Sequence, residues 1–251
     1  MGDPWDWGTF REEQADLPTG TLHYARAGEG PPLIVLHSAA GPRPSPVMHA
    51  LAARHDVHML TAPGFSGTPR HRGVDDIAGL ARMVGSFLER FGKPVDVMGE
   101  SFGGWLALRV ALHFPQAVDH LVLEGPAGLR EEQPAPGVPR IFAREATAPA
   151  AGPYLDANRA AFAAYGGGVF DAELAGRLGE IQARTLVLMG TEEEVIPAST
   201  GRRLKAGIPH SHLTYVYGAG HGLEYDAPER VGPLIARYLE RGEAFLVRQA
   251  S

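Results

Sequence analysis

One stretch, residues 95–108, constrains the fold of this 251-residue chain more than any other. It begins as an apolar run, passes through the pattern Gly99-x-Ser101-x-Gly103, and continues with helical periodicity to about Phe114. A strand that turns into a helix within two residues brings two backbones together, and only glycine lacks the Cβ that would clash there. Such a turn holds the Ser101 hydroxyl at the positive end of a helix. Ser101 is therefore a candidate nucleophile, the alternative being a serine that only caps the helix.

Length and composition bound the class of protein. With 44% hydrophobic residues the chain can bury a substantial core, and its length favours one large domain. The 29 acidic and 23 basic residues give a net charge of -6 without a basic cluster, so neither nucleic acid nor an anionic membrane is an expected partner. Residues 1–6 are acidic and unlike a signal peptide, and no run of about 18 apolar residues occurs. We expect a cytoplasmic monomer or homodimer, and the absence of cysteine excludes disulfides and a thiolate nucleophile.

The rest of the chain alternates between short apolar runs and amphipathic segments. Two early strands, about 10–17 and 21–27, form a hairpin. Helices are expected at about 46–55 and 75–91, and further strands at about 33–36, 57–60, 121–123, 185–189 and 213–217. Strands separated by helices of this length predict an α/β fold with a mostly parallel, doubly wound central sheet.

The alternation breaks between residues 129 and 182. Prolines exclude one long helix there, while 158–165 and 171–181 have the pattern of short amphipathic helices. We interpret 129–182 as a lid inserted into a core of residues 1–128 and 183–251, over the edge of the sheet where ligands bind. Its aromatic residues are expected either to line an apolar substrate pocket or to pack the lid onto the core; they are Phe142, Tyr154, Phe162, Tyr165 and Phe170.

With these segments in place, the chain resembles the α/β-hydrolases, the fold family of serine esterases and lipases, over nearly its whole length. Residues 63–67, Pro-Gly-Phe-Ser-Gly, resemble the loop after the strand that precedes the nucleophile strand. Residues 190–197 resemble the G-x-x-[DE]-x-x-x-P loop that carries the acid of the catalytic triad. Residues 218–222, Gly-Ala-Gly-His-Gly, resemble the loop that carries the triad histidine. The order serine, acid, histidine is the one that this family uses.

The resemblance implies a catalytic triad, and the residue types suit its chemistry. A serine hydroxyl is a weak nucleophile at neutral pH and needs an imidazole to take its proton. His221, on its glycine-flanked loop, is the candidate base. The acid that would orient it is Glu193 by its spacing in the loop, where aspartate is more usual, and Glu192 and Glu194 are its neighbours. Glu124, at the end of the strand after the nucleophile helix, is the reserve candidate.

The resemblance also implies an oxyanion hole of two backbone N–H groups. One belongs to Phe102, the residue after the nucleophile, and the other to Ala39, with Ser38 as the alternative. Most relatives have His-Gly after this strand, whereas this chain has His37-Ser38, and serine resists backbone conformations that glycine permits. We expect either a slightly altered hole or a Ser38 hydroxyl near the substrate, with His37 shaping the loop rather than reacting.

Together these residues imply a serine hydrolase that cleaves a small-molecule ester, thioester or lactone through an acyl-enzyme on Ser101, without metal or organic cofactor. A carbon–carbon bond hydrolase of the meta-cleavage type is the nearest alternative, although such enzymes usually have a large aromatic residue where this chain has Gly222. A lyase or cyclase and a non-catalytic ligand-binding protein are further alternatives. His210 and His212 form an H-x-H pattern without further ligands in evidence, so no metal site is predicted.

Overall fold

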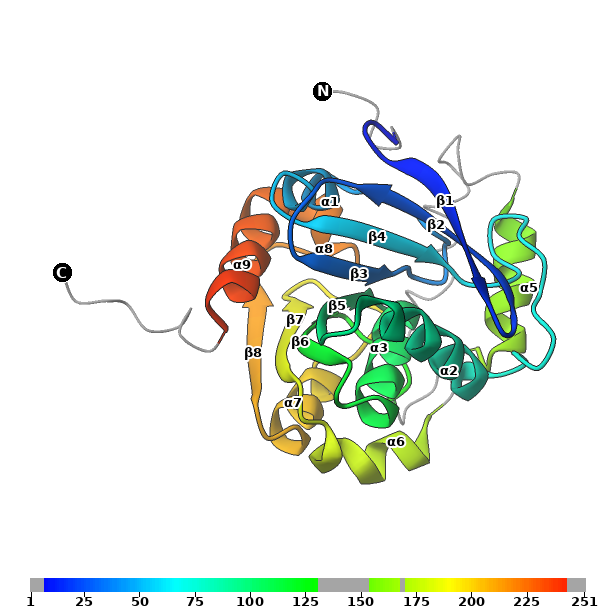
Figure 1. Ribbon diagram of the computed structural model, residues 1–251. Helices are drawn as coiled ribbons and strands as arrows, with labels where there is room; N and C mark the ends of the chain where they lie inside the picture. Colours follow the sequence, from blue (N-terminus) through cyan, green and yellow to red (C-terminus); the bar gives the residue numbers. More distant parts are fainter. Residues whose placement is uncertain (1–6, 131–153, 168–169, 243–251) are drawn as a thin grey trace.

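The computed structural model describes residues 7–130, 154–167 and 170–242. Its centre is an eight-stranded sheet with the order β1-β2-β4-β3-β5-β6-β7-β8 (Figure 1). The strands are Arg11–Leu17 (β1), Gly20–Ala27 (β2), Pro32–Leu36 (β3), Asp56–Thr61 (β4), Val95–Glu100 (β5), Val118–Glu124 (β6), Arg184–Gly190 (β7) and Ser211–Val216 (β8). β2 runs antiparallel to both its neighbours, and the strands from β4 to β8 are parallel. The mostly parallel α/β sheet predicted from the sequence is confirmed.

Helices cover both faces of this sheet (Figure 1). They are α1 (Pro46–Leu51), α2 (Ile77–Leu88), α3 (Phe102–His113), α5 (Leu155–Ala164), α6 (Ala172–Arg177), α7 (Ala198–Gly207), α8 (Leu223–Asp226) and α9 (Pro228–Arg241), with 3-10 turns at Glu89–Phe91 and Leu178–Glu180. One apolar core lies between the sheet and α2, α3 and α7, and a second lies between the sheet and α1, α8 and α9. Among the described helices, none has the length and apolar character needed to cross a membrane.

The helix α2 shows how the sequence produces these layers. Asp76 caps its N-terminus, because the carboxylate accepts a hydrogen bond of 2.6 Å from the backbone N–H of Gly79. Leu80, Val84 and Phe87 recur at helical spacing and are buried against the sheet. Burial of this stripe fixes which face of the helix meets the strands.

Three predicted helices are shorter than expected. The helix predicted over 75–91 spans only Ile77–Leu88 and continues as a 3-10 turn to Phe91. The helix predicted over 46–55 ends at Leu51, because the loop after β2 packs against the backbone that follows. A Cβ on Gly28 in this loop would lie 2.1 Å from the carbonyl oxygen of Ala52, so only glycine, which has no Cβ, allows the two backbones to come this close. The helix predicted over 171–181 ends at Arg177 and continues as a 3-10 turn.

The helices α5 and α6 belong to the segment between β6 and β7, residues 129–182, which we call the β6–β7 insertion. They pack on the α3 side of the sheet, where Ala161 and Leu174 join the first apolar core. The carboxyl ends of the parallel strands meet at one edge of the sheet. The loops that follow β3, β5, β6, β7 and β8 therefore converge there, and they carry the candidate residues.

Candidate active site

Ser101 lies in a sharp turn between β5 and α3. Its φ of 52° and ψ of -110° belong to a region that non-glycine residues rarely adopt. Two hydrogen bonds fix this turn to the end of β6 and the loop after it. The Ser101 N–H donates to the carbonyl of Glu124 at 2.8 Å, and the Ser101 carbonyl accepts from the N–H of Ala127 at 2.9 Å. A Cβ on Gly103 would lie 1.9 Å from the carbonyl oxygen of Leu36, so the start of α3 lies directly against the end of β3.

His221 and Glu193 meet on the loops that follow β8 and β7. Nδ1 of His221 lies 2.8 Å from Oε2 of Glu193. The other carboxylate oxygen of Glu193, Oε1, accepts hydrogen bonds from the backbone N–H groups of Val195 at 2.7 Å and Ile196 at 3.1 Å. These contacts hold the carboxylate against the imidazole. Nε2 of His221 is buried and has no hydrogen-bond partner among the described residues, so it is the nitrogen available for proton transfer.

The other candidate acids lie elsewhere. Glu192 and Glu194 are exposed. Glu124 is completely buried, and its carboxyl group faces that of Glu224 on α8. The hydrogen bond to His221 favours Glu193 over these three.

The imidazole and carboxylate shift each other's pKa. Burial disfavours both charged forms, but the pairing outweighs it. The hydrogen bond and charge of His221, with the N–H groups of Val195 and Ile196, lower the pKa of Glu193. The hydrogen bond and charge of Glu193, with the charges of Glu100 and Asp226, raise the pKa of His221. Near neutral pH, Glu193 is therefore ionised.

The raised pKa of His221 makes a prediction about activity. The predicted role of His221 as general base requires an unprotonated imidazole, so kcat/KM for a neutral ester is expected to fall as the pH drops, with a midpoint above the usual imidazole value of about 6.5. The unperturbed imidazole pKa alone would place this fall in kcat/KM at a pH of about 6 to 7. The measurement is a pH profile of kcat/KM, with Glu193→Gln expected to lower the midpoint. An unchanged limb in His221→Ala would assign the titration to another group.

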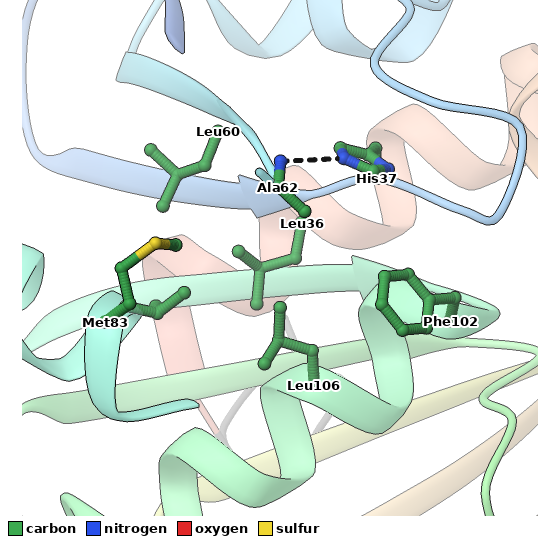
Figure 2. Close-up of a pocket in the computed structure, with 8 residues that line it drawn as sticks. Leu36, His37, Leu60, Ala62, Met83, Phe102 and Leu106 are labelled. Carbon is green, nitrogen blue, oxygen red and sulfur yellow. Dashed lines mark hydrogen bonds between the residues drawn. The ribbon is translucent and has the colours of Figure 1, made fainter. Parts of the chain in front are cut away.

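His37 organises the loop after β3. Its Nδ1 donates to the carbonyl of Ser38 at 2.7 Å, and its Nε2 accepts the N–H of Ala62 at 3.0 Å (Figure 2). The second bond needs an unprotonated Nε2, and burial lowers the pKa of His37 to about 4. His37 therefore stays neutral with both nitrogens occupied, and its role is to fix the loop.

The same contacts orient the Ser38–Ala39 peptide. The carbonyl of Ser38 accepts a second hydrogen bond, from the N–H of Gly41 at 3.1 Å. In a trans peptide the N–H points opposite to the carbonyl, so the N–H of Ala39 points away from His37 and Gly41. Because α3 begins against the end of β3, the N–H of Phe102 belongs to a neighbouring segment. That the two groups together bind one developing negative charge stays a prediction.

The predicted pocket aromatics of the β6–β7 insertion occupy different environments. Tyr165 is buried, stacks on Phe102 at 6.3 Å between ring centroids, and donates its hydroxyl to the carbonyl of Pro63 at 2.8 Å. Phe162 lies edge-on to Phe102 at 5.6 Å. Both rings therefore pack the insertion onto the residue after Ser101.

Tyr154 and Phe170 are partly exposed, and Tyr154 covers Gly67 of the loop after β4. Phe142 lies outside the described residues. The apolar cavity in Figure 2 is lined by core residues from β3, β4, α2 and α3 and by none of these aromatics. A second cavity reaches Ser38 and Glu100. A substrate-pocket role for the insertion aromatics stays a prediction.

Three carboxyl groups gather at the ends of β5 and β6. Glu100 and Glu124 pair in register at the ends of β5 and β6, and Glu224 follows on α8. Neither carboxyl oxygen of Glu124 accepts a hydrogen bond from a described N–H or O–H group. Burial and the neighbouring charges raise the pKa of Glu124 well above its usual range and that of Glu224 to about 8, so the facing pair holds a proton at neutral pH. Sequence reasoning missed Glu100 and Glu224; the available signal was a glutamate ending each of two neighbouring strands.

This pair predicts how stability depends on pH. In the unfolded chain Glu224 loses its proton near a pKa of about 4.3, whereas in the folded protein it keeps the proton to about 8. Between these values the folded state holds more protons, so the free energy of unfolding falls as the pH rises. Glu224→Gln is expected to flatten this dependence in guanidinium unfolding at pH of about 5, 6.5 and 8. Equal slopes for the two proteins would contradict the raised pKa of Glu224.

One group of potential metal ligands lies near the opposite ends of β5 and β6. Ligand atoms of Asp96, Asp119 and His120 lie within 4.8 Å of one another. The guanidinium of Arg184 donates to Asp119 at 2.9 Å, and Nδ1 of His120 pairs with Asp96 at 2.8 Å. These contacts describe an ion-pair network, and we infer no metal there.

Comparison with known proteins identifies the family. A model described as the alpha/beta hydrolase family matches residues 2–233. The chain belongs to this family. This α/β-hydrolase is 26% identical to the 2-hydroxy-6-oxononadienedioate/2-hydroxy-6-oxononatrienedioate hydrolase 2 of Pseudomonas putida, over 92% of the chain and 94% of the relative.

Solved structures share the fold of this α/β-hydrolase. A meta-cleavage product hydrolase from Pseudomonas fluorescens superposes with a TM-score of 0.72 at 20% identity, covering 88% of this chain and 94% of the other. The carboxylesterase CesB of Bacillus subtilis superposes with a TM-score of 0.71 at 19% identity, covering 92% and 91%. At these identities the structures establish the fold, and one fold serves many reactions.

Proposed function

We propose that this α/β-hydrolase is a serine hydrolase that cleaves a small ester, thioester or lactone through an acyl-enzyme on Ser101. The observation that carries the proposal is the 2.8 Å contact between His221 and Glu193, at the same edge of the sheet as the strained turn of Ser101. A buried imidazole paired through Nδ1 presents Nε2 as a base, which is what a serine nucleophile needs.

The proposed reaction has two halves. Oγ of Ser101 attacks the substrate carbonyl carbon while Nε2 of His221 takes the hydroxyl proton. The N–H groups of Phe102 and Ala39 stabilise the oxyanion, and its collapse expels the alcohol, which receives the proton from His221. Water then attacks the acyl-enzyme by the same route, and this releases the acid and restores Ser101. Glu193 stabilises the imidazolium that forms in each half.

The names of the relatives favour a second candidate, hydrolysis of a carbon–carbon bond in a meta-cleavage product. It would use the same serine, histidine and acid. Gly222 counts against this candidate, because these enzymes usually carry a large aromatic residue there. We therefore rank ester, thioester or lactone cleavage first.

Transient kinetics separates these possibilities. The protein is mixed with p-nitrophenyl esters of graded acyl length and, in parallel, with 2-hydroxy-6-oxo-6-phenylhexa-2,4-dienoate. An ester burst that approaches the enzyme concentration, with a higher kcat/KM for esters than for the dienoate, supports the first candidate. The reverse preference supports the second. Turnover of neither compound class, with no burst on thioesters or lactones, would contradict both and leave a binding protein.

A further inference from the structure

Asn158 occupies an unusual place on α5. The buried face of this helix consists of Leu155, Asn158 and Ala161, spaced three residues apart, and Asn158 is only 2% exposed. An amide at the centre of an apolar face costs free energy unless its hydrogen bonds are made. Its contacts therefore explain why this position is polar.

The amide joins two loops that are remote in sequence. Nδ2 of Asn158 donates to the carbonyl of Ala40 at 2.6 Å, in the loop after β3. Oδ1 accepts the N–H of Ser66 at 2.7 Å, in the loop after β4. Ser66 has a φ of 49°, a conformation that a non-glycine residue keeps only when its surroundings hold it. One side chain of the β6–β7 insertion thus ties both loops.

The fit at this contact is close. Gly41 has a φ of 97°, and a Cβ there would lie 2.7 Å from Nδ2 of Asn158. An aspartate at position 158 keeps the shape and the acceptor for Ser66 but has no N–H for Ala40 when ionised. A leucine would leave both backbone groups without this partner.

The hydrogen bond from Asn158 also fixes the loop after β3, which would carry the second oxyanion donor. The carbonyl of Ser38 is held by His37 and Gly41, and the carbonyl of Ala40 is held by Asn158. Ala39 lies between these two fixed carbonyls. We propose that Asn158 is a positioning residue for the oxyanion hole, through which the β6–β7 insertion sets the direction of the Ala39 N–H. This inference rests on the proposed function.

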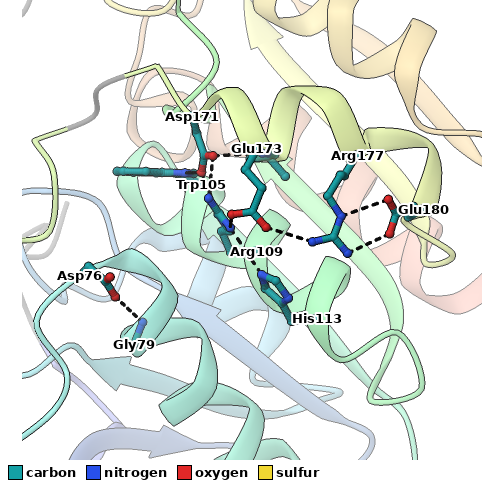
Figure 3. A network of polar contacts seen from close by, with 10 residues as sticks. Asp76, Gly79, Trp105, Arg109, His113, Asp171, Glu173, Arg177 and Glu180 are labelled. Carbon is teal, nitrogen blue, oxygen red and sulfur yellow. Dashed lines mark hydrogen bonds and ion pairs between the residues drawn. The ribbon is translucent and has the colours of Figure 1, made fainter.

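A matched control is available in the same insertion. Asp171 precedes α6 and anchors it to α3, because its carboxylate accepts hydrogen bonds from Trp105 at 2.7 Å and from Arg109 at 2.6 Å and 2.7 Å (Figure 3). No hydrogen bond of Asp171 reaches the loop after β3. Asp171→Asn therefore weakens the attachment of the insertion without touching the Ala40 carbonyl.

The test compares Asn158→Asp, Asn158→Leu and Asp171→Asn with the wild type, at a temperature where circular dichroism shows each to be folded. Substrate kinetics are paired with the affinity for a boronic acid that forms a tetrahedral adduct on serine. For Asn158→Asp we expect kcat to fall by about 10-fold to 100-fold with KM within about 3-fold, since the loss of a whole donor costs about 10²-fold to 10³-fold. Boronate affinity should fall with kcat/KM. Asp171→Asn should lower the melting temperature and leave the ratio of boronate to substrate affinity unchanged.

A second readout does not depend on activity. Hydrogen exchange of the peptide that contains residues 37–43 should be faster in Asn158→Asp and unchanged in Asp171→Asn. Should Asn158→Leu not fold, Gly41→Ala disturbs the same contact from the loop side and is expected to give the same kinetic signature. Wild-type kcat and boronate affinity in Asn158→Asp, or a KM effect alone, would overturn the proposal. A wild type that neither turns over esters, thioesters or lactones nor shows a burst would instead refute the proposed function, and unchanged exchange in the loop would then refute the tie as well.

Discussion

Replacing Ser101 by alanine is expected to lower kcat by about 10³-fold or more, because the change removes the proposed nucleophile. The fold should be retained, since the Ser101 side chain makes no capping hydrogen bond to α3. Turnover of an activated ester measures the first effect, and a thermal melt followed by circular dichroism measures the second. Alanine also suits the strained backbone no worse than serine does, so the two effects are separable.

The alternative role for this serine, a helix cap, predicts the opposite pattern. Loss of a cap destabilises a protein by about 0.5–2 kcal/mol and leaves chemistry elsewhere intact. A Ser101→Ala protein with wild-type turnover and a lowered melting temperature would therefore contradict the mechanism. Turnover and melting temperature measured on the same Ser101→Ala protein therefore distinguish a nucleophile from a helix cap.

Replacing Glu193 by glutamine is the second large effect that we expect. The amide keeps the shape of the carboxylate but no longer fixes the Nδ1–H tautomer of His221 or stabilises its cation, a change that costs about 10⁴-fold in kcat in serine proteases. The matched controls are Glu192→Gln and Glu194→Gln, which alter exposed neighbours in the same loop and should lose little. The measurement is kcat at saturating ester, above the pH at which His221 loses its proton.

Glu124→Gln is the informative comparison, because Glu124 was the other acid that the sequence allowed. Its carboxyl group faces Glu224, so the amide should alter the pH dependence of stability and change kcat far less than Glu193→Gln does. If Glu124→Gln is the inactive protein and Glu193→Gln remains active, the assignment of the acid is wrong.

The central turn could be predicted from the sequence because its causes are local. An apolar run, the spacing Gly99-x-Ser101-x-Gly103 and a following helical stripe lie within about twenty residues and specify strand, corner and helix together. The parallel sheet follows from the alternation of such units. The end of α1 was not predictable, because the loop around Gly28 packs against the backbone beyond Leu51 from a distant part of the chain.

Contacts between distant segments set the same limit at the candidate site. The spacing of the Glu193 loop indicated a triad acid, and the structure adds the bond to His221 that the spacing could not give. The helical pattern over 158–165 indicated α5 but gave no partner for Asn158, whose two bonds reach residues 118 and 92 positions away. Register across two strands likewise brings Glu100 beside Glu124.

Covalent labelling identifies the nucleophilic residue itself, which we propose is Ser101. The protein is treated with a fluorophosphonate, digested, and the modified peptide identified by mass spectrometry. We expect a single adduct on Ser101, no labelling of Ser101→Ala, and slower labelling of His221→Ala because the base that activates the hydroxyl is gone. An ester-hydrolysing wild type that is labelled at another residue, or whose Ser101→Ala variant is labelled and turns over normally, would show that Ser101 is not the nucleophile.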